Sequence, residues 1–81
     1  MYRIYNPLID KFSKGGLYTH WSKNGKVWVT MGYLKSHLTM IKEYPHIYNH
    51  SYIKDNCMVI NVLTDESFPV KLLIDNPENF K

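Results

Sequence analysis

The sequence predicts a small α+β domain, in which one antiparallel sheet of about four to five strands is covered on one face by a single central helix. Three observations predict this class. An Asn-Gly pair lies between two aromatic, β-branched segments; apolar residues then recur at helical spacing; and two later apolar runs flank a short acidic turn. The expected element order is β-β-β-α-β-β, with both hairpins in the sheet.

Length and composition indicate one soluble domain, residues 1–81. A chain of this size buries only about 60–65% of its unfolded surface, so its core is modest. With 44% hydrophobic and 15% aromatic residues, it is too apolar for a disordered chain. No stretch has the roughly 20 apolar residues that a membrane span requires, and no export signal is recognisable. We therefore expect a cytoplasmic protein without membrane contact.

The first expected strand covers residues 2–6, where apolar and polar side chains alternate before Pro7. Residues 10–18 are then expected to form a loop that turns at Gly15 and Gly16. In this loop, "KGG" lacks the strand and helix context of a phosphate-binding motif, so we interpret it as a turn.

A tight hairpin is expected around the Asn-Gly pair at 24–25. This dipeptide favours a type I′ turn, which requires positive φ at both central residues. A two-residue loop would place Trp21 opposite Trp28 and Lys23 opposite Lys26. Because side chains alternate across a strand, these four residues would share one face of the ribbon.

A helix should follow directly, with Thr30 as its N-cap and Pro45 ending the pattern after Tyr44. Its buried face is predicted to contain Met31, Leu34, Leu38 and Ile41. Gly32 weakens the first turn by up to about 1 kcal/mol relative to alanine, but would allow close approach to the sheet. Residues 45–56 are expected to form an irregular connection with one helical turn.

The second hairpin is expected from two apolar runs, residues 57–64 and 68–74, joined by the turn at 65–67. Pro69 is best accommodated on an edge strand. The lone Cys57 excludes an internal disulfide, and its apolar surroundings predict a small buried side chain. The edge strand and the apolar hairpin make a homodimer a further expectation.

Charge is distributed unevenly along the chain. Residues 1–42 contain seven basic residues and one acidic residue, whereas residues 43–81 contain three basic and six acidic residues. Basic residues gathered on one surface raise the local positive potential. The first half is therefore expected to contact an anionic partner, unless its lysines are scattered over the surface.

The predicted contact surface combines indole rings with ammonium groups. Stacking contributes about 1–3 kcal/mol per base and cations neutralise phosphate, so these residue types suit nucleic acid as well as an acidic protein face. The predicted partner-binding residues are Trp21, Lys23, Lys26, Trp28, Lys14 and Lys35. The alternative is that both tryptophans belong to the core, since cross-strand aromatic pairs stabilise hairpins by themselves. A second aromatic cluster, suited to protein contact or to packing, consists of Tyr44, Tyr48 and Tyr52.

Catalytic and metal-binding patterns are weak. His46 and His50 are four residues apart, as in a helical metal pair, but Pro45 argues against a helix long enough to hold both. His20 and His37 have no carboxylate or nucleophile nearby in the sequence. We expect no enzymatic activity, no metal and no cofactor.

Residues Lys11 to Leu38 also carry a resemblance. The run "KFSKGG", followed by "WSKNGKVWVTMGYLKSHL", resembles a module of small accessory (early) proteins of tailed bacteriophages and covers about a third of the chain. The resemblance implies a protein that binds a host protein or nucleoprotein complex in the bacterial cytoplasm and inhibits or redirects it, host defence included. Two alternatives stay open. One is direct nucleic-acid binding through the hairpin, and the other is a ligand-sequestering protein with a pocket lined by His, Tyr and Lys.

Overall fold

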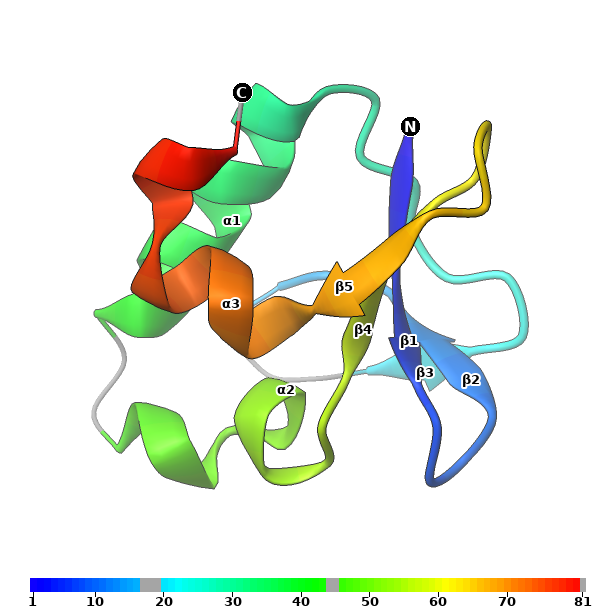
Figure 1. Cartoon of the computed structure of the whole chain (residues 1–81). Helices are drawn as coiled ribbons and strands as arrows, with labels where there is room; N and C mark the ends of the chain where they lie inside the picture. The colour runs from blue at the N-terminus through cyan, green and yellow to red at the C-terminus, as the bar shows by residue number, and fades with distance from the viewer. Residues whose placement is uncertain (17–19, 44–45, 81) are drawn as a thin grey trace.

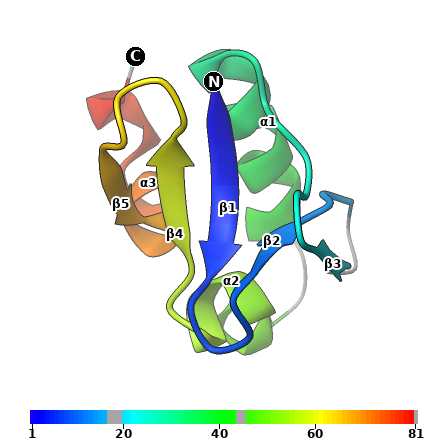
Figure 2. The same cartoon turned by 90° about the vertical axis from the view of Figure 1, so that its right-hand side faces the viewer.

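A computed structural model describes residues 1–16, 20–43 and 46–80, and in it one antiparallel sheet has its helices on a single face (Figure 1). The order of the five strands is β3-β2-β1-β4-β5. Their bounds are Tyr2–Asn6 for β1, Lys11–Ser13 for β2, Trp21–Ser22 for β3, Met58–Asn61 for β4 and Ser67–Pro69 for β5. The predicted α+β class is confirmed. Figure 2 shows the other face of β1 and β4, with no helix in front of it.

The main helix, α1, is accompanied by shorter ones. The bounds are Met31–Lys42 for α1, Ser51–Lys54 for α2, Val70–Asp75 for α3, and Ile47–Asn49 and Pro77–Asn79 for the 3-10 turns η1 and η2. Helical turns η1 and α2 lie in the predicted irregular connection, as expected. Within the described ranges, no helix combines the length and the apolar character that crossing a membrane requires.

Strand β1 has the predicted bounds and is the central strand of the sheet. Its alternating pattern buries Ile4 and Asn6 fully against the helices, while Arg3 and Tyr5 lie on the other face. It pairs antiparallel with β4 on one side and with β2 on the other. Strand β2 lies within the segment that the sequence predicted to be a loop.

Helix α1 begins as predicted, because the side chain of Thr30 accepts a hydrogen bond from the Tyr33 amide at 3.2 Å. The residues buried on its inner face are Leu34, Leu38 and Ile41. Gly32 is exposed, and a Cβ added there would meet only the Thr30 hydroxyl at 3.7 Å. The glycine therefore does not serve a close approach to the sheet. The predicted stop at Pro45 lies outside the described residues, and the helix ends at Lys42.

The predicted hairpin around 24–25 is wrong. Gly25 has a φ of 65°, but Asn24 is not in the left-handed region, so a type I′ turn does not form. The Gly25 amide instead donates to the Ser22 hydroxyl at 2.8 Å. Trp21 pairs with Ser13 of β2 rather than with Trp28.

Trp28 forms a separate bridge with the first residue of β1. The Tyr2 amide donates to the Trp28 carbonyl at 2.8 Å, and the Trp28 amide donates to the Tyr2 carbonyl at 2.9 Å. Strand β2 pairs only with the last two residues of β1. The backbone groups of Tyr2 on that side of β1 can therefore pair with another segment. The chain therefore leaves β3 and returns to β1, which satisfies backbone groups that a two-residue hairpin would leave unpaired.

The second hairpin is confirmed as a pair of antiparallel strands, but its connection spans residues 62–66 instead of the predicted 65–67. Strands β4 and β5 pair antiparallel, and β5 is an edge strand that contains Pro69, as predicted. Residues 70–74, predicted to continue the strand, instead belong to helix α3, Val70–Asp75. Its buried residues Val70, Leu73 and Ile74 are spaced so that they lie on one face of a helix. The run is therefore compatible with a helix, and it packs against α1.

Substitutions at two glycines test the observed backbone conformation and packing of Gly25. We expect Gly25→Ala to destabilise the protein by at least about 1–3 kcal/mol from backbone strain alone. A Cβ there would also lie 2.5 Å from the Phe12 Cβ and 2.7 Å from the Ser13 carbonyl oxygen. Gly32→Ala is the matched control and should stabilise by up to about 1 kcal/mol, since its surroundings are open. Urea unfolding of both variants measures the two changes, and equal effects would contradict the close packing of residue 25 on β2.

Candidate functional site

An open hollow lies between the segment 26–29 and the first turns of α1, with an empty volume of about 850 Å³ that includes space open to solvent. It combines residues of the segment predicted as a hairpin strand with residues of the helix that follows it. Its lining consists of Lys26, Val27, Trp28, Val29, Tyr33, Ser36 and His37. We call it the Lys26 hollow.

Trp28 lines the inner side of this hollow, and its exposed fraction is 3%. The Lys26 ammonium lies 5.4 Å from the centroid of the indole, within the range of a cation-π contact. Gly15 packs on the same two residues, because a Cβ there would lie 3.2 Å from the Lys26 Cδ and 3.4 Å from the Trp28 ring. The predicted "KGG" turn therefore packs against the Lys26 hollow through Gly15.

The rim of the Lys26 hollow is apolar and accessible. Val29 is 60% exposed and Tyr33 is 66% exposed. Single exposed apolar residues are common on proteins, but here two of them adjoin a lysine at the mouth of one concave surface. The rim thus offers apolar contact area and a positive charge together.

His37 joins the hollow to the interior. Its ring stacks on Trp28 with centroids 4.9 Å apart, and its Nε2 lies 2.9 Å from the Tyr52 hydroxyl oxygen. Burial lowers the pKa of His37 to about 4, and the nearby Lys26 and His50 act in the same direction. His37 is therefore neutral at pH 7, and the positive charge of the hollow comes from Lys26.

Hydrogen bonds connect Gly15, Ser13, Tyr52 and His37 in a chain. The Gly15 amide donates to the Ser13 hydroxyl at 3.0 Å, and the Ser13 and Tyr52 hydroxyl oxygens are 2.5 Å apart. If Ser13 donates to Tyr52, then Tyr52 donates to neutral His37, and both hydroxyl groups have a donor and an acceptor partner. Burial raises the pKa of Tyr52 to about 12, so the phenol keeps its proton.

This chain of hydrogen bonds holds side chains in place and does not present a nucleophile. Ser13 has 0% exposed surface, so a substrate has no access to its hydroxyl. Tyr52 also separates Ser13 from His37, which places the histidine out of reach as a base for the serine. Cys57 is buried as predicted, and burial raises the pKa of its thiol to about 12.

The predicted ribbon of paired indoles and lysines does not form. Trp28 is part of the core, and Trp21 is half-buried, with its ring edge-to-face on Tyr52 at 6.1 Å. Burying a large aromatic ring stabilises a small domain, because it removes much apolar surface from water. The alternative that the tryptophans belong to the core therefore holds for Trp28 and in part for Trp21.

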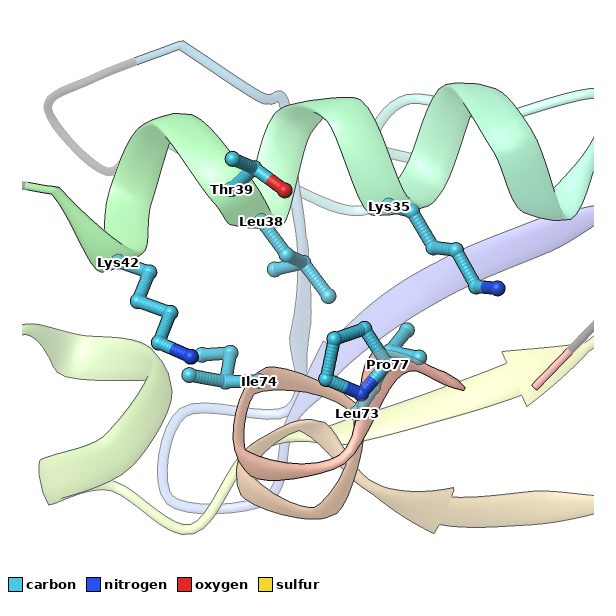
Figure 3. A pocket seen from close by; sticks show the side chains of 7 residues that line it. All are labelled: Lys35, Leu38, Thr39, Lys42, Leu73, Ile74 and Pro77. Carbon is cyan, nitrogen blue, oxygen red and sulfur yellow. The ribbon is translucent and has the colours of Figure 1, made fainter. Parts of the chain in front are cut away.

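The predicted lysines divide into two groups. Lys14, Lys23 and Lys26 are exposed around the β2 and β3 edge of the sheet. Lys35 lies on the other flank of α1, where its ammonium donates to the Phe80 carbonyl. Figure 3 shows it over a small hollow between α1 and α3, next to Leu73 and Pro77. Lys35 therefore does not belong to the surface that contains Lys26.

The described tyrosines of the predicted aromatic cluster do not form one exposed surface. Tyr48 is 70% exposed on η1, whereas Tyr52 is 1% exposed in the core. Tyr44 lies outside the described residues. Tyr33 was not among the predicted site residues, although its position between Met31 and Leu34 puts it off the buried helical stripe, where an aromatic residue is unusual.

Within ranges 1–16, 20–43 and 46–80, no group of three or more His, Cys, Asp or Glu side chains is arranged to hold a metal ion. His46 and His50 flank the short turn η1 and do not lie on one helix. Comparison with known proteins finds no matching family model, curated protein or solved structure.

The buried position of His37 predicts a pH-dependent stability. Its folded pKa is about 4, below the ordinary 6.5, so the unfolded chain binds more protons between these values. The stability contributed by neutral His37 is complete above pH 6.5 and is lost as the pH falls toward 4. We expect the urea midpoint of the wild type to fall more steeply over this window than that of His37→Gln. Parallel curves would contradict this assignment.

Proposed function

We propose that this protein is a small, non-enzymatic accessory protein of the phage type, which binds a host protein or nucleoprotein in the bacterial cytoplasm and inhibits it. The Lys26 hollow is the proposed docking site. One observation carries the proposal: Lys26 lies over a buried indole at the mouth of a concave surface whose rim exposes Val29 and Tyr33.

The residue types at this site match those of protein interfaces. Exposed aromatic residues are enriched at the cores of such interfaces, where tyrosine supplies both apolar area and a hydroxyl. Trp28 and His37 are fixed by stacking and hydrogen bonding, so little side-chain entropy is lost when a partner contacts them. The complementary partner segment would have an apolar side chain next to a carboxylate.

The spatial arrangement of charge supports an acidic partner surface. The strand order places β2 and β3, with Lys11, Lys14, Lys23 and Lys26, at one edge of the sheet. The turn between β4 and β5, with Asp65 and Glu66, lies at the other edge. These four lysines therefore lie at one edge and this acidic turn at the other, which would orient an approaching acidic partner.

A sequestered small ligand is the less supported alternative. The hollow does contain the expected lysine, tyrosine and histidine. Sites that retain small molecules, however, bury about 70–90% of the ligand surface. The Lys26 hollow is open to solvent on one side, which suits a segment of a larger partner better.

Affinity capture from bacterial host lysate, followed by titration of the purified partner, tests the proposal. We expect Tyr33→Ser and Lys26→Glu each to weaken binding about 5- to 30-fold, as for truncation of an interface residue worth about 1–2 kcal/mol. Matched controls are Tyr48→Ser, which removes a tyrosine of similar exposure on η1, and Lys71→Glu on α3.

The controls should bind within about twofold of the wild type, because surface residues outside a contact contribute little. Circular dichroism must show the wild-type fold in each variant. If Tyr33→Ser and Lys26→Glu bind like the controls, the hollow is not the docking site.

A further inference from the structure

The segment 26–29 is bonded to the sheet through alternate residues. The Trp28 amide and carbonyl both pair with Tyr2 of β1. Two residues earlier, the Lys26 amide donates to the Ser13 carbonyl of β2 at 2.8 Å. Hydrogen bonds from every second residue to the same sheet are the pattern of an extended strand.

The residues between and after these two leave an unpaired strand edge. Backbone groups of successive residues in an extended chain point to opposite sides, so those of Val27 and Val29 point away from β1 and β2. Among the residues that the structure describes, neither valine has a hydrogen-bond partner for its amide or its carbonyl. Figure 2 shows this part of the chain beside β1, on its way from β3 to α1.

The unpaired edge borders the Lys26 hollow. All four residues of 26–29 line this hollow, although side chains alternate between the two faces of an extended segment. A hollow lined by every residue of such a segment runs along its backbone edge, and β1 occupies the other edge at Trp28. Helix α1 forms the opposite wall with Tyr33 and Ser36.

We propose that the docking segment of the partner binds in the Lys26 hollow as an added antiparallel strand, paired with Val27 and Val29. This inference rests on the function proposed above and specifies how the partner is recognised. Unpaired strand edges bind extended peptides in this way, because main-chain hydrogen bonds supply affinity and alternate side chains supply specificity. The antiparallel direction is that of every strand pair in this sheet.

The pairing register specifies the side chains of the partner. A residue opposite Trp28 directs its side chain to the same side as the indole, and the residue opposite Lys26 follows two positions later. The first side chain would meet the Trp28 and His37 rings, whose centroids are 4.9 Å apart, so an apolar residue fits there. The second would meet the Lys26 ammonium, which favours a carboxylate. The expected motif is an apolar residue, any residue, and then Asp or Glu.

The outer edges of the sheet suit an added strand less well. Strand β5 contains Pro69, which has no amide to donate. Strand β3 consists of only two residues, Trp21 and Ser22. The edge at Val27 and Val29 offers two amides and two carbonyls next to a concave surface.

Amide hydrogen exchange of the free protein, followed by NMR, tests whether the edge is open. We expect the Val27 and Val29 amides to exchange at nearly unprotected rates, and the Trp28 amide to exchange at least about tenfold more slowly. Protection of both valine amides in the free protein overturns the inference, whether an internal contact or self-association causes it. Sedimentation at the same concentration identifies self-association.

Titration with the peptide acetyl-Thr-Leu-Thr-Glu-Thr-amide tests the occupant. Its Leu is designed to lie opposite Trp28 and its Glu opposite Lys26. Binding should shift and protect the Val27 and Val29 amides. N-methylation of the Thr between Leu and Glu should weaken binding at least about fivefold, because this amide donates to Val27. N-methylation of Leu is the matched control and should change affinity less than about twofold, since that amide points away from the edge.

A charge exchange tests the register. Lys26→Glu should prefer a peptide with Lys in place of Glu, whereas the wild type should prefer the original peptide. No shift of the valine amides at about 5 mM peptide overturns the inference, as do equal effects of the two N-methyl groups.

The outcomes separate this inference from the proposed function. If a captured host protein binds the hollow but leaves the Val27 and Val29 amides unprotected, the added strand is wrong and the proposed function stands. If the peptide binds as expected and no host protein is captured, the mode of binding at the edge stands and the proposed function fails.

Discussion

The backbone bridge between Trp28 and Tyr2 is the constraint on which the rest of this structure depends. Strand β2 reaches only the end of β1, and Trp28 completes the vacant edge at Tyr2 with two hydrogen bonds. The bridge turns the indole inward, where its exposed fraction is 3%. Helix α1 then packs His37 on that ring, so one β-bridge positions the helix relative to the sheet.

The contact surfaces follow from this arrangement. Burial of Trp28 leaves Lys26 over the edge of the core and Val29 at the surface, which creates the Lys26 hollow. Because the helices lie on one face of the sheet, Arg3, Tyr5 and Phe12 stay partly exposed on the other face.

Local signals predicted the elements that depend on neighbours in the sequence. The alternation in residues 2–6 and the Thr30 cap with its helical apolar stripe are short-range patterns, and both elements formed as expected. The tight hairpin predicted at the Asn-Gly pair was wrong because the preference of this pair for a turn is small compared with the backbone hydrogen bonds available at β1 and β2. The strand predicted for residues 70–74 was wrong because a short apolar run fits both a strand and a helix, and only packing against α1 decides between them.

The site was predicted in part. Lys14, Lys23 and Lys26 lie together at one edge, but the tryptophans expected beside them are wholly or half buried, and Lys35 binds the Phe80 carbonyl elsewhere. Tyr33 and His37 joined the hollow only through the packing of α1 against segment 26–29.

By itself, the sequence determined the fold class, the first strand, the main helix and the separation of charge between the two halves of the chain. These properties follow from the side-chain period, the cap and the composition, which are local. Tertiary structure alone decided which indole is buried, which lysines share a surface and which face of the sheet stays open. The reason is that backbone hydrogen bonds at the sheet edges and the burial of rings are satisfied between segments far apart in the chain.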